Sequence, residues 1–203
     1  KESQGAMKVE LKENERLDEL QRNGYRIIQN PEKFCFGMDA VLLSGFASAR
    51  NGDQVLDMGT GTGIIPILME AKTQAAHLTG LEIQEESADM ARRSVALNHL
   101  TDKIEIVTGD IKEAAQIFGT ESFQVVTCNP PYMKENSGKN NVHTEKYIAR
   151  HETTADIGGF AACAYRALKD GACAYFVYRP DRCADIIHAL KENRLEPKVL
   201  TFV

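Results

Sequence analysis

The sequence VLDMGTGTGIIP, residues 55–66, joins an apolar run to a glycine-rich turn and then to the start of a helical pattern. A short apolar run bounded by a turn is typical of a buried strand. Glycine permits positive φ angles and lets the backbone approach a ligand closely. The first N–H groups of the following helix have no partner inside that helix. The stretch therefore predicts a strand, a turn that contacts a ligand, and a helix.

The spacing of the three glycines separates this turn from two common phosphate-binding loops. Dinucleotide-binding proteins use G-x-G-x-x-G, and the P-loop places a lysine after its last glycine. Here the pattern is G-x-G-x-G, and an isoleucine follows. Taken alone, the turn is about equally well explained as an ordinary strand–helix connection.

Short apolar runs and helical patterns alternate along the rest of the chain. Strands are predicted at residues 54–58, 78–83, 103–108, 123–128, 172–178 and 198–203, and helices at residues 64–71, 85–100, 111–117, 154–168 and 181–191. This alternation predicts right-handed βαβ units and a mostly parallel sheet with helices on both faces. We expect an α/β, doubly wound, Rossmann-like fold.

The first part of the chain differs from this pattern. Residues 26–29 form a short predicted strand, and one helical face is predicted to hold Met38, Val41, Leu42, Phe46 and Ala49. We expect residues 1–53 to be an extension that covers the sheet, and residues 54–203 to be the main domain.

Bulk composition excludes several classes of protein. The 203 residues suffice for one domain, and no apolar run reaches the roughly 20 residues that cross a bilayer. The five cysteines form no C-x-x-C pair, which favours reduced thiols in a cytoplasmic protein without a metal site. The net charge of −5 argues mildly against nucleic acid, although a local basic surface remains compatible with it.

Two acidic residues follow the next predicted strands. Glu82 lies near the end of the second strand, where a carboxylate can accept hydrogen bonds from both ribose hydroxyls of a nucleoside. Asp110 follows the third strand, where it can accept from an adenine amino group. Each has a simpler interpretation, because Glu82 can be a solvated strand end and Asp110 with Glu113 fits a helix capping box.

The order of these features resembles the class I S-adenosylmethionine methyltransferase family. That family has an acidic residue before G-x-G-x-G, an acidic ribose ligand and an acidic residue beside the adenine. The resemblance implies that S-adenosylmethionine is the cofactor. It also implies that the cofactor is lined by Asp57, Gly59, Gly61, Gly63, Glu82, Ile83 and Asp110.

After the fourth predicted strand comes Asn129-Pro130-Pro131-Tyr132. Two prolines also make a rigid turn, which is the simpler interpretation. At the carboxyl end of a strand, however, the motif occupies the crevice where α/β sheets bind ligands. There it resembles the N-P-P-Y signature of methyltransferases that act on adenine N6, cytosine N4, guanine N2 or a glutamine amide.

The chemistry of such an amino group explains the motif. Its lone pair is delocalised into the ring or carbonyl, so the nitrogen is a poor nucleophile. The Asn129 side-chain oxygen and the Pro130 carbonyl can accept from both N–H groups and favour a localised lone pair. The prolines limit reorganisation of these acceptors, and Tyr132 offers a flat face for stacking the target ring.

Further sequence blocks extend the resemblance over nearly all of the chain from Glu15 onward. They also point to one group within the family. Residues 16–20, 27–29, 34–43, 82–84, 127–132 and 149–152 look like the bacterial tRNA1(Val) adenine-37 N6-methyltransferases of the methyltransferase small domain group. This implies a tRNA substrate and places Phe36 and Asp39 at the methionine end of the cofactor. Packing and a helix N-cap at Asp39 explain these two residues equally well. The family sheet also has a seventh, antiparallel strand, which we expect this chain to lack.

Residues 133–150 form a long polar segment beside the N-P-P-Y motif. Its basic residues are the candidate RNA contacts: Lys134, Lys139, Lys146 and Arg150. A solvated surface loop is the alternative. A protein glutamine N5-methyltransferase, an rRNA guanine N2-methyltransferase and a non-catalytic nucleotide-binding regulatory module remain alternative functions. The oligomeric state is left open.

Overall fold

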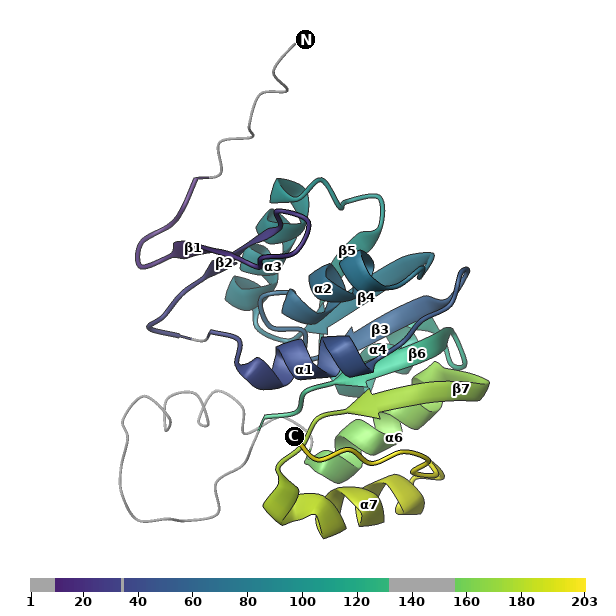
Figure 1. Ribbon diagram of the computed structural model, residues 1–203. Helices are drawn as coiled ribbons and strands as arrows, with labels where there is room; N and C mark the ends of the chain where they lie inside the picture. The colour runs from purple at the N-terminus through teal and green to yellow at the C-terminus, as the bar shows by residue number, and fades with distance from the viewer. Residues whose placement is uncertain (1–9, 34, 132–155) are drawn as a thin grey trace.

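The computed structural model describes residues 10–33, 35–131 and 156–203. Its centre is a five-stranded sheet with the strand order β5-β4-β3-β6-β7 (Figure 1). The strands are β3 (Gln54–Met58), β4 (His77–Glu82), β5 (Ile104–Thr108), β6 (Phe123–Cys128) and β7 (Leu168–Phe176). All neighbouring strands pair in parallel, which confirms the expected doubly wound α/β fold.

Helices cover both faces of the sheet. One face carries α1 (Met38–Phe46), α2 (Ile64–Lys72) and α3 (Glu85–Leu97). The other carries η1 (Ile111–Glu113), α4 (Ala114–Phe118) and α6 (Ile157–Ala167). The short η2 (Pro180–Arg182) leads into α7 (Cys183–Glu192), which packs beside α6.

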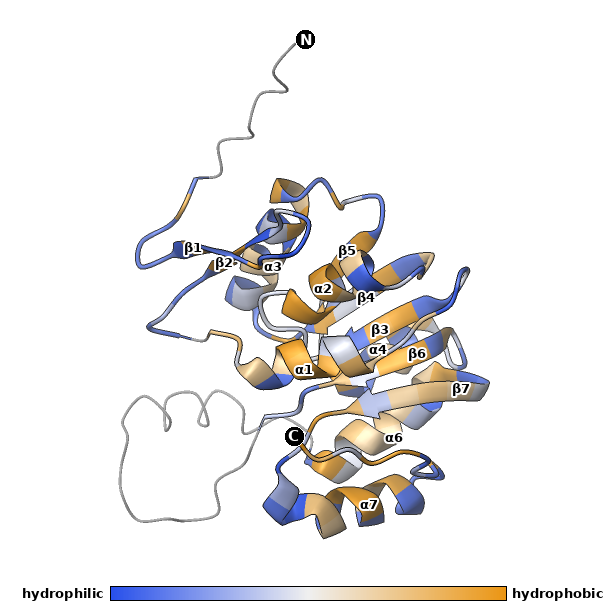
Figure 2. Ribbon diagram, viewed as in Figure 1, coloured by the Kyte–Doolittle hydropathy of each residue, from blue (hydrophilic) through white to orange (hydrophobic). Residues whose placement is uncertain are grey.

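The core forms because successive strand residues point to opposite faces. Val55 and Val125 join the apolar cluster under α1, α2 and α3, whereas Leu56 and Val126 join the cluster under α4 and α6. The two central strands β3 and β6 are therefore largely apolar and almost wholly buried (Figure 2). Burial on both faces is the reason that these strands read as continuous apolar runs.

An antiparallel hairpin precedes the sheet, formed by β1 (Arg16–Glu19) and β2 (Arg26–Gln29). The strand β2 was predicted and β1 was not. Side chains of α3 bond to the backbone of β2: Ser94 Oγ accepts from Ile28 N at 2.9 Å, and Asn98 Oδ1 accepts from Arg26 N at 2.9 Å. The helix thus satisfies backbone groups that a further strand would otherwise pair.

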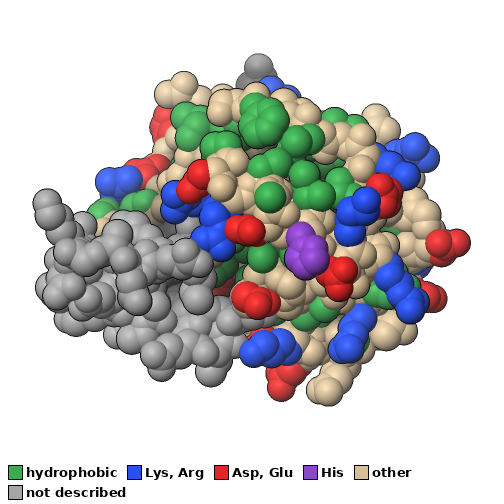
Figure 3. Space-filling view, turned by 90° about the horizontal axis from the view of Figure 1, so that it is seen from below, with side chains coloured by type: hydrophobic (Ala, Val, Ile, Leu, Met, Phe, Trp, Pro, Cys, Tyr) green, Lys and Arg blue, Asp and Glu red, His purple; other side chains and the backbone are tan. Residues whose placement is uncertain are grey.

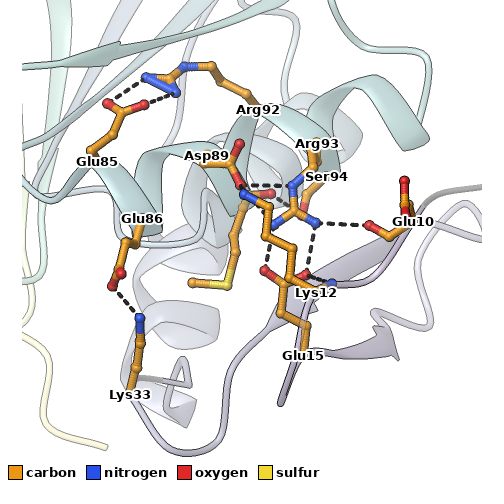
Figure 4. A network of polar contacts seen from close by, with 11 residues as sticks. Glu10, Lys12, Glu15, Lys33, Glu85, Glu86, Asp89, Arg92, Arg93 and Ser94 are labelled. Carbon is orange, nitrogen blue, oxygen red and sulfur yellow. Dashed lines mark hydrogen bonds and ion pairs between the residues drawn. The ribbon is translucent and has the colours of Figure 1, made fainter.

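Charged side chains fasten the start of the hairpin to α3 (Figure 4). Arg93 donates to both oxygens of Glu15, at 2.5 and 2.9 Å, and to Asp89 Oδ2 at 2.9 Å. Lys12 also donates to Asp89, at 2.7 Å. The Glu15 side chain is only 5% exposed, and its hydrogen bond with Arg93 lowers the pKa of its carboxyl group.

The prediction of a strand at residues 198–203 is wrong. These residues adopt no regular structure, and Val199, Leu200, Phe202 and Val203 are exposed. Their apolar pattern predicts a strand, but a strand also needs a partner edge, and none of the described strands pairs with them. Figure 3 shows apolar side chains gathered among charged ones on the face seen from below. Counted along the chain, a seventh strand is present among the described residues: β7, which is a parallel edge strand of the five-stranded sheet.

Other boundaries differ by a few residues. The strand predicted at 172–178 begins earlier, at Leu168, directly after α6. The predicted face of α1 is also wrong, because Ala40, Leu43 and Ser44 are buried while Met38 is 70% exposed. None of the helices within the described ranges is long and apolar enough to cross a membrane.

Candidate active site

The order of the sheet reverses between β3 and β6, which are neighbouring parallel strands with their carboxyl ends at the same edge. From β3 the chain proceeds to β4 and β5 on one side, and later to β6 and β7 on the other. Ligands of open α/β sheets bind where the order reverses in this way. Met58 pairs with Cys128 across these strands, so Gly59 and Asn129 follow at the same end. The fold thus brings the glycine turn and the start of the N-P-P-Y motif together.

The glycine turn depends on left-handed backbone conformations. The φ angles of Gly59, Gly61 and Gly63 are +71°, +57° and +85°, which side-chain-bearing residues rarely adopt. Gly63 is the N-cap of α2, and a Cβ atom there would lie 3.1 Å from the Cβ of Ala91 in α3. The turn therefore requires glycine both for its conformation and for the packing of two helices.

Glu82 ties the end of β4 to this turn. Its side chain is buried, Oε2 accepts from Gly61 N at 2.8 Å, and Oε1 accepts from Gln84 N at 2.9 Å. A carboxylate oxygen can accept more than one hydrogen bond. The carboxylate is thus held rigidly beside the turn in an arrangement that is compatible with binding ribose hydroxyls.

Asp57 lies at the end of β3, directly before the turn, and is fully buried. Burial raises the pKa of its carboxyl group to about 6, although Thr127 Oγ1 opposes the shift by donating to Oδ1 at 2.6 Å. Within the described ranges, three buried oxygens make no hydrogen bond of standard geometry, although Thr60 lies close enough to Asp57 to favour its ionised form: Asp57 Oδ2, Thr60 Oγ1 and Thr62 Oγ1. Buried polar atoms normally have partners, so these oxygens fit the binding of a polar ligand.

Asp110 and Ile83 follow the ends of β5 and β4. Asp110 is the N-cap of η1, and its Oδ1 accepts from Lys112 N at 2.9 Å. The helix-capping interpretation of Asp110 therefore holds, with Lys112 rather than Glu113 as the main-chain donor. Ile83 is 37% exposed directly beyond β4, and the cofactor-binding roles of both residues stay predictions.

The residues of the N-P-P-Y motif begin directly after β6. Asn129 Nδ2 donates to Asp39 Oδ2 at 3.1 Å, and Asp39 Oδ1 accepts from Ala40 N at 2.9 Å. The N-cap of α1 is Gly37, so the alternative of an N-cap at Asp39 is wrong. The sequence gives no local signal for this contact, because 90 positions separate the two residues.

The remaining candidate residues divide into two groups. Phe36 packs partly buried against the core, and its N–H donates to Gln29 Oε1 at 2.9 Å. Other candidates lie outside the described residues: Tyr132, Lys134, Lys139, Lys146 and Arg150.

Comparison with known proteins identifies the family of the chain. The methyltransferase small domain family matches residues 37–163. The chain belongs to that family. A relative from Porphyromonas gingivalis, named tRNA1(Val) (adenine(37)-N6)-methyltransferase, is 29% identical over 173 residues, which are 82% of this chain and 67% of the relative. The chain thus spans about two thirds of that relative's length.

Solved structures share the fold. A predicted O-methyltransferase from Agrobacterium tumefaciens has a TM-score of 0.57 at 24% identity, over 75% of this chain and 66% of that one. A geranyl diphosphate C-methyltransferase from Streptomyces coelicolor A3(2), solved with S-adenosyl-L-homocysteine, has a TM-score of 0.57 at 14% identity. The match covers 77% of this chain and 60% of that one. Family and fold identify an S-adenosylmethionine-dependent methyltransferase, as the motifs predicted.

Proposed function

We propose that this protein methylates the exocyclic N6 of an adenine in the anticodon loop of a tRNA. The observation that carries the proposal is the position of Asn129 and Pro130 at the switch point of the sheet, beside the glycine turn. The name of the Porphyromonas gingivalis relative supports the choice of adenine and tRNA. Such a substrate also implies a cytoplasmic location.

The cofactor is held by the residues around the turn. We assign the ribose to Glu82, the adenine to Ile83 and Asp110, and the methionine end to the glycine turn and the oxygens beside Asp57. Phe36 is a further candidate at the methionine end, whereas Asp39, the other residue that the resemblance placed there, contacts Asn129. When bound, S-adenosylmethionine supplies an electrophilic methyl group on a sulfonium.

The residues after β6 prepare the acceptor. The Asn129 Oδ1 atom and the Pro130 carbonyl oxygen accept hydrogen bonds from the two N–H groups of the target amine. As positive charge develops on that nitrogen, both bonds strengthen, so they stabilise the transition state more than the ground state. The Pro130-Pro131 backbone keeps these acceptors in place, and proximity lowers the barrier further.

A transfer assay with labelled cofactor tests the substrate class. The purified protein is incubated with pools of tRNA, rRNA, DNA and protein, and labelled products are digested to nucleosides or amino acids. We expect label in tRNA as N6-methyladenosine. Label in glutamine of a release factor, or in N2-methylguanosine of rRNA, would replace the proposed substrate. Binding of S-adenosylhomocysteine without transfer to any pool would favour a regulatory module.

A further inference from the structure

The Asn129 side chain has two ends with opposite hydrogen-bonding properties. Its Oδ1 atom accepts and its Nδ2 group donates. The proposed function requires the oxygen to face the amine of the substrate. A half-turn of the amide about its last torsion would present N–H groups to N–H groups and remove the interaction. The site therefore needs a neighbouring group that favours one orientation of the Asn129 amide.

The structure places a carboxylate that can do this next to Asn129. Asp39 Oδ2 lies 3.1 Å from Asn129 Nδ2. An ionised carboxylate can only accept, so the amide end that faces it is the donor. The opposite orientation would bring two acceptor oxygens together and lose a charge-assisted hydrogen bond. We infer that Asp39 is a positioning residue, which turns the Asn129 oxygen toward the acceptor amine; this inference rests on the proposed function.

The carboxylate of Asp39 is itself held in place. Its other oxygen accepts from Ala40 N at 2.9 Å, in the first turn of α1. A Cβ atom at Gly37 would lie 2.5 Å from that same oxygen. Gly37 has φ −97° and ψ 176°, an extended conformation that any residue adopts. A side chain at position 37 would therefore push the carboxylate of Asp39 out of its place.

Two variants separate this role from a role in folding. Asp39→Asn keeps the size of the side chain. When its oxygen accepts from Ala40 N, its NH2 group faces Asn129 and favours the opposite orientation of that amide. Gly37→Ala leaves the backbone unstrained and displaces the carboxylate. In both variants we expect kcat to fall about tenfold, the value of one hydrogen bond to a charged group. The melting temperature and the Kd for S-adenosylhomocysteine should stay unchanged.

Asp181→Asn is the matched control. Asp181 is an exposed carboxylate that pairs with Arg179, and its substitution should leave kcat unchanged. A Kd for S-adenosylhomocysteine that rises about tenfold in Asp39→Asn, with kcat preserved at saturation, would overturn the inference and make Asp39 a cofactor contact.

A double-mutant cycle tests whether Asp39 acts through Asn129. In the Asn129→Ala background, Asp39→Asn should cause no further loss of kcat. Independent, multiplied losses would contradict the inference.

The Asn129 side-chain amide gives a readout that does not depend on activity. Its NMR signals are assigned by their loss in Asn129→Ala, and we expect them to shift in Asp39→Asn. Unchanged signals would overturn the inference even if the substrate proves not to be RNA. A wild-type protein that transfers no methyl group to tRNA, while the amide signals do shift, would refute the proposed function alone.

Discussion

Asp57 links the stability of the fold to pH through a single proton. Its pKa is about 6 in the folded protein because the carboxyl group is buried, whereas an aspartate in an unfolded chain titrates near 4. Between these values the folded state holds a proton that the unfolded state has lost. Ionisation of the buried Asp57 thus leaves the free energy of unfolding unaffected below about pH 4 and lowers it by its full amount above about pH 6.

The Asp57→Asn variant should remove this dependence. Relative to wild type, its free energy of unfolding is expected to rise by up to about 3 kcal/mol between pH 4 and pH 7. Urea denaturation at unit pH steps measures the difference. If the difference in free energy of unfolding between wild type and variant is the same at about pH 4 and at about pH 7, Asp57 does not titrate as described.

Asn129→Ala should abolish most transfer and leave cofactor binding nearly intact. One preorganised hydrogen-bond partner of the reacting group is lost, by analogy with an oxyanion-hole donor, which costs about 3 kcal/mol in the barrier. Single-turnover rates and calorimetry with S-adenosylhomocysteine measure the two effects separately. A variant that keeps more than about a third of the wild-type rate would remove Asn129 from the proposed chemistry.

At the scale of elements, the pair of Arg93 and Glu15 is the least exposed of the ion pairs described between the N-terminal segment and α3. The Arg93 side chain is 22% exposed and its partner Glu15 is 5% exposed. Arg93→Ala removes the two hydrogen bonds between charged groups that hold this carboxylate, and we expect it to lower the free energy of unfolding by about 2–3 kcal/mol. Denaturant titration measures the loss.

The neighbouring Arg92→Ala is the matched control. Its side chain is 40% exposed and pairs with Glu85, which is 67% exposed, so the expected cost is below about 1 kcal/mol. Because Arg93 lowers the pKa of Glu15, the effect of Arg93→Ala should be complete near neutral pH. It should shrink as the pH falls through the acidic range in which Glu15 becomes protonated. If both substitutions lower the free energy of unfolding equally, the pair of Arg93 and Glu15 does not specifically stabilise the contact between the hairpin and α3.

Sequence patterns predicted the buried elements better than the exposed ones. The strands β3 to β6 are apolar runs between turn residues, so local sequence identifies them to within a residue or two. The α1 helix carries apolar residues on more than one face, and periodicity therefore did not indicate which side faces the core. The strand β1 is polar, and it forms through its pairing with β2.

Some features of the candidate site could be predicted from the sequence and others could not. The glycine turn, Glu82 and the N-P-P-Y motif follow successive strands, so their common edge could be deduced from the order of elements. The hydrogen bond from Gly61 to Glu82 and the contact between Asp39 and Asn129 depend on the packing of distant segments. No pattern within one segment encodes them.

For the molecule as a whole, the proposed tRNA substrate requires an acidic chain to bind a polyanion. The net charge is −5, but residues 133–150 carry Lys134, Lys139, Lys146 and Arg150 against Glu135 and Glu145. Replacing these four basic residues together with alanine should weaken tRNA binding. It should also reduce the slope of log K against log salt by about 3, at roughly 0.7–0.9 per phosphate contact. An unchanged slope would show that RNA binds elsewhere, and an unchanged affinity for S-adenosylhomocysteine is the control.

The parallel sheet also implies an order of folding. Val55 of the central strand pairs with Leu78 on one side and with the far more distant Val125 on the other. Closing the longer loop costs more chain entropy and slows the pairing. During refolding, the amides of β4 should therefore gain protection from hydrogen exchange before those of β6. The half of the candidate site that we assign to the cofactor should then form first, so S-adenosylhomocysteine binding should recover earlier than transfer activity. Simultaneous recovery of both would indicate a single concerted step.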